Sequence, residues 1–122
     1  MIHHIDAHVR SLAGPKRLFD ALMPSFARTR VVSDSDGVTY YAEDKTLPFF
    51  GLILDADHKP GTSRTAFAAP SRAGVDVLAA IASANGAEST DGPAACPEYG
   101  PNYYAFFFED SSANKYEICF NG

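Results

Sequence analysis

Side chains that can bind metal ions or move protons occur near both ends of the chain, at the two-residue spacing of β-strands. Near the amino end, His4, Asp6 and His8 alternate with apolar residues. Near the carboxyl end, Glu117 interrupts a run of apolar and aromatic residues. Because side chains alternate between the two faces of a strand, the first three residues form one polar stripe. Imidazoles and carboxylates can act as metal ligands or as general acids and bases.

Glu117 needs a polar environment, since burying an unpaired carboxylate costs several kcal/mol or forces its protonation. It shares a strand face with Lys115 and Cys119, while Tyr116 and Ile118 point to the other face, which we expect to be core. Glu117 is therefore expected to face water, a cavity or a cation. An exposed position on a half-solvated sheet is the alternative interpretation, both for this carboxylate and for the polar stripe at the amino end.

The helices and strands that carry these residues follow the same order in the two halves of the chain. For the first half, the sequence predicts one helix and four strands. The helix is expected from about Ala13 to Met23, because Pro15 fits its first turn and Pro24 ends it. The strands are expected at residues 2–10, 30–34, 38–42 and 49–54.

The second half repeats this order after a loop at residues 55–61, which we interpret as the junction. A helix is expected at about residues 72–85, because Ser71 can cap its first turn and Gly86 can end it. The strands are expected at 64–69, as one short strand within the irregular stretch 87–100, and as an aromatic hairpin within 99–120. Neither half can cover its own sheet, so we expect the two sheets to pack side by side or against a second chain.

Composition excludes several classes of function. The 122 residues suffice for one domain with a core, and the net charge of −5 disfavours binding to nucleic acid. No apolar run approaches the ~20 residues of a membrane-spanning helix, and the amino end does not resemble a signal peptide, so we expect a cytoplasmic protein. Cys96 and Cys119 are far apart and are expected to be free thiols.

Three stretches of the second half resemble a known superfamily. They are 65–72, 97–105 and 109–117, the last of which is similar to a D-P-D-G-N-x-x-E turn and strand. They resemble the vicinal oxygen chelate superfamily, which includes glyoxalase I, bleomycin resistance proteins, extradiol dioxygenases and fosfomycin resistance enzymes. Residues 2–21 also resemble the opening strand and helix of that superfamily. The resemblance implies a single α+β domain, 1–122, in which paired βαβββ modules at about 1–56 and 62–122 form curved mixed sheets around a cleft.

The resemblance also implies a site for a divalent metal. Members with a metal centre use a His of the first strand, a His that opens the second half and a Glu of the last strand. The matching residues are His4, Arg64 and Glu117. Arg64 departs from the pattern, because a guanidinium has no lone pair to donate and repels a divalent cation by several kcal/mol in a partly buried site. We expect Arg64 to pair with Glu117 or Asp6, or to bind an anionic group of a ligand.

A metal site remains an alternative. His4 and Glu117 would bind Zn, Ni, Mn or Fe if another residue supplied the missing ligand. His8 lies ~13 Å from His4 along the strand, so Asp6 is the nearer substitute. If no residue substitutes for Arg64, the protein would hold no metal.

Two functions are consistent with this resemblance. The first is a glyoxalase-like lyase or isomerase on a small oxygenated substrate, with Glu117 as the catalytic residue that moves a proton. The second is a metal-free binding protein of the bleomycin resistance type. The residues expected to contact the ligand are Asp6, His8, Arg64, Tyr103 and Phe107, the last two because the resemblance implies that their strand face lines the cleft. The resemblance also implies a homodimer.

Overall fold

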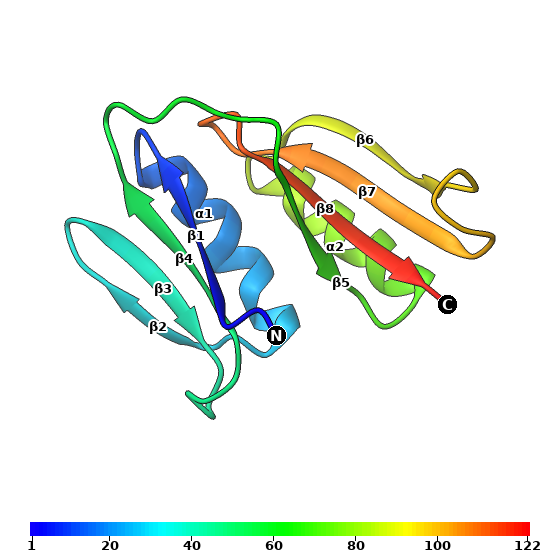
Figure 1. The fold of residues 1–122 in the computed structure, drawn as a ribbon, viewed down its shortest axis with the longest axis horizontal. Coiled ribbons are helices and arrows are strands. Elements are labelled where there is room, and N and C mark those ends of the chain that lie inside the picture. Colours follow the sequence, from blue (N-terminus) through cyan, green and yellow to red (C-terminus); the bar gives the residue numbers. More distant parts are fainter.

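The computed structural model describes residues 1–122 and consists of two modules of the same topology (Figure 1). The first module comprises β1 (His4–Val9), α1 (Ala13–Leu22), the short 3₁₀ helix η1 (Met23–Phe26), β2 (Arg30–Ser33), β3 (Gly37–Tyr41) and β4 (Phe49–Leu54). The second comprises β5 (Arg64–Ala68), α2 (Arg72–Ala84), β6 (Glu88–Ala95), β7 (Tyr103–Glu109) and β8 (Lys115–Asn121). The predicted α+β fold of paired βαβββ modules is confirmed.

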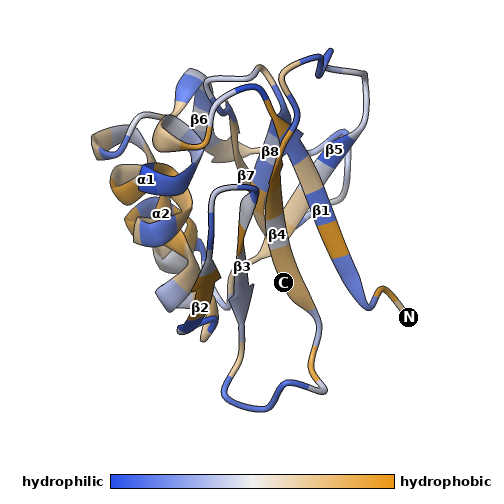
Figure 2. Cartoon of the chain, turned by 90° about the vertical axis from the view of Figure 1, so that its left-hand side faces the viewer, coloured by the Kyte–Doolittle hydropathy of each residue, from blue (hydrophilic) through white to orange (hydrophobic).

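Each module forms one four-stranded mixed sheet. The strand order is β1-β4-β3-β2 in the first sheet and β5-β8-β7-β6 in the second. β1 pairs in parallel with β4, and β5 pairs in parallel with β8, while the other pairings are antiparallel. The sheets lie side by side with β1 and β5 at the centre of the molecule, and both helices pack on the same side of the sheets (Figures 1 and 2). Neither helix has the length and hydrophobicity that a membrane-spanning helix needs.

Local sequence signals set most helix ends. Pro24 lies within η1, and the chain leaves this helix at Ala27 in the left-handed conformation with φ of 56°. In the second module the Ser71 hydroxyl accepts a hydrogen bond of 2.9 Å from the Gly74 backbone N–H, which is the predicted amino-terminal cap of α2. Gly86 follows α2 with φ of 97°.

The largest difference from the sequence prediction is in β6. A short strand was expected within residues 87–100, but β6 has eight residues, 88–95, and pairs with β7 with two register shifts. The shifts lie around Ser89 and Gly92, which have positive φ. Pairing with the aromatic strand β7 thus extends a segment whose own residues favour irregular structure.

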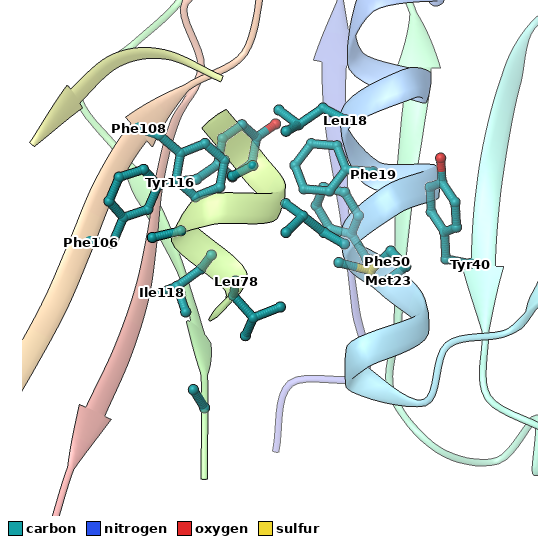
Figure 3. Packing of buried hydrophobic residues seen from close by; sticks show 14 of the residues in the cluster. Leu18, Phe19, Met23, Tyr40, Phe50, Leu78, Phe106, Phe108, Tyr116 and Ile118 are labelled. Carbon is teal, nitrogen blue, oxygen red and sulfur yellow. The ribbon is translucent and has the colours of Figure 1, made fainter. Parts of the chain in front are cut away.

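Aromatic side chains from both modules form the core between sheets and helices (Figure 3). The Phe19 ring of α1 lies 4.7 Å from Phe50 of β4 and 5.0 Å from Tyr116 of β8, measured between ring centroids. Phe67 of β5 lies 5.3 Å from Phe50. Such pairs stabilise a fold by about 0.5–1.5 kcal/mol each beyond the burial of their area. Because Tyr116 and Ile118 are fully buried on this side, Glu117 must point to the opposite face of β8.

The turn before β8 joins the two modules. The buried Asp110 carboxylate accepts hydrogen bonds from the Ser112 N–H, the Asn114 side chain and the Tyr116 hydroxyl. The Asn114 amide nitrogen also donates to the His8 carbonyl of β1 at 2.8 Å. These bonds hold the start of β8 next to β1. They therefore determine where Glu117, further along β8, lies relative to the first sheet.

Candidate functional site

Glu117 is a buried carboxylate on the face of the second sheet that carries no helix. Its residue is only 6% exposed, and on the neighbouring strands it lies in register with Ala66 and Phe107. The Tyr103 hydroxyl donates a hydrogen bond of 2.7 Å to Oε2 of Glu117. Such a short bond to an ionised acceptor is among the stronger hydrogen bonds in proteins. The Tyr103 hydroxyl is thus the polar partner that we expect a buried carboxylate at this position to need.

Tyr103 acts as a hydrogen-bond donor in this pair. Burial raises the pKa of Tyr103, and its hydrogen bonds with Cys119 and Glu117 raise that pKa further. The phenol therefore keeps its proton at neutral pH and donates a hydrogen bond to the carboxylate. Tyr103 starts β7 opposite Asn121, four residue pairs from Glu117, so its ring reaches along the sheet to make this bond.

Arg64 lies above the same sheet face, with its guanidinium carbon 4.7 Å from the centre of the Phe107 ring. Since β8 lies between β5 and β7, the Arg64 side chain reaches across β8 to make this contact. None of the four ion pairs in the structure involves Arg64. The prediction that it pairs with Glu117 or Asp6 is wrong, because its guanidinium stacks on an aromatic ring instead. Its N–H groups therefore stay available to a ligand.

A cavity of about 310 Å³ opens beside this stacked pair. Arg64, Phe107 and Lys115 line it together with three carboxylate residues, Asp91, Glu98 and Glu109. Glu117 and Tyr103 line none of the five cavities of the chain. Glu117 is buried and Tyr103 is partly buried, so this pair borders no cavity of the single chain, whereas Arg64 and Phe107 do.

His4 and Asp6 line a different cavity, of about 390 Å³, on the face of the first sheet. The His4 ring stacks on Phe49 of the neighbouring strand, with ring centroids 4.5 Å apart and planes 4° from parallel. Nε2 of His4 lies 3.6 Å from Oδ2 of Asp6, and both side chains are partly exposed. This end of the amino-terminal polar stripe therefore lies on a solvent-exposed face of the first sheet.

His8 lines a third cavity, of about 260 Å³, at the junction of the modules. Its Nδ1 lies 3.0 Å from Oδ2 of Asp55 and must carry the proton, because a carboxylate only accepts. This hydrogen bond is the main cause of a lowered pKa at Asp55. Nε2 of His8 is then the ring nitrogen left to accept a proton. The sequence does not indicate this pair, because its two members are 47 residues apart.

His58, in the loop at residues 55–61, also lines the junction cavity. The Asn114 amide nitrogen donates to the His8 carbonyl and to Asp110, so its oxygen must accept from His58 Nε2, 2.8 Å away. His58 Nδ1 is therefore free, and the ring centroids of His8 and His58 are 6.3 Å apart. The sequence does not predict that His58 lies near His8, because the path of the junction loop decides where His58 is placed.

The three positions that the resemblance assigns to a metal do not form a site within one chain. No group of three His, Cys, Asp or Glu side chains lies close enough to hold an ion. His4 lines the cavity of the first sheet, Glu117 is buried on the second sheet, and Arg64 stacks on Phe107. A cationic guanidinium in the second of these positions does not fit a divalent ion. Metal binding thus needs at least a residue from elsewhere.

The surroundings of Cys96 do not favour a nucleophilic thiolate. Burial raises the pKa of the Cys96 thiol, and the carboxylates of Glu98 and Glu117 raise it further, which disfavours the thiolate. Cys119 is half-buried beside Tyr103. Both are free, as predicted.

Several solved structures share the fold of this chain. No family model matches the sequence, and no curated protein matches it at a significant level. A glyoxalase/bleomycin resistance protein from Albidiferax ferrireducens superposes with a TM-score of 0.82 at 22% identity, covering 100% of this chain and 99% of that chain. A proposed glyoxalase from Bacillus halodurans gives a TM-score of 0.77 at 27% identity and covers 99% and 96%. A fosfomycin resistance protein from Mesorhizobium loti gives 0.71 at 15% identity, covering 100% and 92%.

Proposed function

The chain has the glyoxalase-like fold of the vicinal oxygen chelate superfamily, and on that premise we propose that it binds a small polar molecule without a metal ion. The binding site is the cavity on the face of the second sheet, and Arg64 supplies the positive charge that a metal supplies elsewhere. The observation that supports this most is the position of Arg64. Its guanidinium is held over Phe107 with no carboxylate partner, at the edge of a cavity of ligand size.

Charges around the cavity indicate the chemistry of the ligand. Arg64 and Lys115 present donors for an anionic group, and Asp91, Glu98 and Glu109 present acceptors for hydroxyl or amino groups. A small molecule with a carboxylate or phosphonate at one end and hydrogen-bond donors at the other would satisfy both sets. The Phe107 ring supplies apolar contact and fixes the guanidinium plane.

Asp6 and His8 lie in the neighbouring junction cavity, which shares Lys115 and Tyr116 with the cavity of the second sheet. Lys115 lines both the cavity of the second sheet and the junction cavity that Asp6 and His8 line. A short ligand would stay within the cavity that contains Arg64, and a longer one would extend past Lys115 toward His8. The predicted contacts of Asp6 and His8 therefore depend on ligand length.

A ligand screen with a matched pair of arginine variants tests the proposal. The thermal unfolding midpoint is measured with a panel of small carboxylates and phosphonates, because a ligand that binds only the folded state raises it. Arg64→Ala should weaken binding by about 10-fold to 100-fold, the usual effect of a lost hydrogen bond to a charged group. Arg72→Ala is the control, because Arg72 stacks on Tyr104 at 5.1 Å in the same way but lines no cavity. Equal losses in both variants would refute the role of Arg64.

A glyoxalase-like lyase or isomerase is the second candidate, and the Glu117–Tyr103 pair supports it. A carboxylate that is 6% exposed and aligned by a phenol is suited to accept a proton from a carbon acid. The test uses a ligand found by the screen, dissolved in heavy water. Exchange of its carbon-bound protons that disappears in Glu117→Gln would support catalysis, and no exchange with the wild-type chain would exclude it.

We also propose that the chain forms a homodimer through the sheet faces that carry no helix. Apolar side chains on the first of these faces are exposed, with Val32 57% and Ile53 37% exposed. Their burial against a second copy would stabilise the assembly. The molar mass in solution from light scattering tests this, with twice the chain mass expected. A monomer at all concentrations would exclude a site shared between two copies.

A further inference from the structure

The largest cavity of the chain, about 420 Å³, differs from the sites described so far, although it shares Phe49 with the cavity that His4 lines. It opens between η1 of the first module and the end of β5 of the second. It shares no lining residue with the cavity that contains Arg64. Its volume falls in the range of ordinary small-molecule sites.

Aromatic rings form the walls of this cavity. Phe26, Phe49, Phe50 and Phe67 all line it. The Phe67 ring lies 5.5 Å from Phe26 and 5.3 Å from Phe50, and it is almost perpendicular to the latter. Ala66 and Ala68 line the β5 side and leave space beside these rings. An aromatic or aliphatic group is therefore the part of a ligand that these walls favour.

One charged residue lines the cavity, and it is cationic. Arg28 is half-buried and held by two backbone carbonyls, with Nε 2.8 Å from the Pro48 oxygen and Nη1 2.9 Å from the Phe26 oxygen. Its Nη2 makes no hydrogen bond, and no ion pair of the structure involves Arg28. No Asp or Glu lines the cavity.

A cation in an apolar wall with no counter-charge selects an anion. The backbone contacts hold the guanidinium plane in place, so little side-chain freedom is lost when a ligand binds. The N–H groups left over form a fork that matches a carboxylate. The surrounding rings lower the local dielectric and strengthen such a pair relative to an exposed one.

We propose that this cavity is a second binding site, for a small amphipathic carboxylate whose apolar group packs against Phe26 and Phe67 and whose carboxylate pairs with Arg28. It is independent of the proposed function at Arg64.

Calorimetric titration with two probes of similar shape, of which only one is an anion, tests this site. The probes are 3-phenylpropanoate and its neutral amide, titrated into the full chain at neutral pH. The acid should bind with a dissociation constant of about 1 mM or tighter and at least about 10-fold more tightly than the amide. Equal affinities of the two probes, or no binding of the acid, would overturn the proposal. A second copy of the chain that covers the cavity would give the latter result and would overturn it too.

Two variants locate the bound probe. Arg28→Lys keeps the charge but loses the fork, and it should reduce the preference for the acid. Ala68→Leu fills the cavity and should weaken both probes without touching Arg28. The control is Arg17→Gln, because Arg17 also donates to a backbone carbonyl, that of Ala84 at 2.9 Å, but lines no cavity. An unchanged acid preference in Arg28→Lys, or unchanged affinities in Ala68→Leu, would show that the probe binds elsewhere.

Discussion

Removal of one hydroxyl group, by Tyr103→Phe, tests whether the Glu117 carboxylate depends on its aromatic partner. The substitution keeps the ring and deletes only the group that donates to Glu117 at 2.7 Å. Glu117 is 6% exposed, so water replaces the lost donor incompletely. The carboxylate is then left buried without its partner.

The expected loss of stability follows from the type of bond. A hydrogen bond to a charged group contributes about 1.5–3 kcal/mol, and a partner left unsatisfied in a buried position pays the desolvation cost. For a domain of this length, each kcal/mol lowers the unfolding midpoint by about 4 °C. Tyr103→Phe should therefore lower the midpoint by roughly 6–12 °C.

The assay is urea and thermal unfolding at fixed protein concentration, since an oligomer would make the midpoint depend on concentration. Tyr99→Phe is the matched control. The Tyr99 residue is 58% exposed, and its ring contacts Tyr103 at 5.4 Å, but its hydroxyl makes no hydrogen bond. Its removal should change stability by less than about 0.5 kcal/mol. Equal, small effects of the two substitutions would refute the view that Tyr103 stabilises Glu117.

Two further predictions concern the fold. The Tyr40 hydroxyl donates to Asp20 at 2.9 Å, and burial raises the pKa of Tyr40 above its usual value near 10. The folded chain therefore keeps a proton that the unfolded chain loses, so this contribution to stability is complete below about pH 10 and declines above it. Urea unfolding at pH 8 and pH 11 should show that the decline is smaller in Tyr40→Phe than in the wild type. Gly92→Ala should destabilise the chain by about 1–3 kcal/mol, because φ is 93° and a Cβ there would lie 2.7 Å from the Ala105 carbonyl oxygen. Gly61→Ala meets nothing within 4 Å and should leave thermal unfolding unchanged, whereas equal midpoints for the two would contradict the argument.

The order of elements could be predicted because apolar periodicity and turn residues mark it. β4 begins and ends at the predicted residues, 49–54, since Pro48 and a polar loop flank an apolar run. β6 could not be predicted in the same way. Residues 88–95 alternate poorly, and the strand forms because β7 offers a pairing edge. That edge is a tertiary contact, which local sequence does not encode.

The faces of the site residues could also be predicted, but their partners could not. Alternation along β8 places Glu117 opposite the core, as expected. Its contact with Tyr103 depends on the β7–β8 register and on the reach of a tyrosine ring. The Arg64–Phe107 contact requires β8 to lie between β5 and β7, which only the sheet order shows. The pairing of His8 with Asp55 likewise depends on the path of the junction loop.

Calorimetric titration of the tag-free chain with Zn²⁺ tests the central claim most directly, namely that a guanidinium replaces a metal ion in this site. With Arg64 in one of the three ligand positions, the charge repulsion predicts no binding tighter than about 1 mM. Micromolar binding that is lost in Glu117→Ala would contradict the claim, because it would show that Glu117 helps to hold an ion despite Arg64.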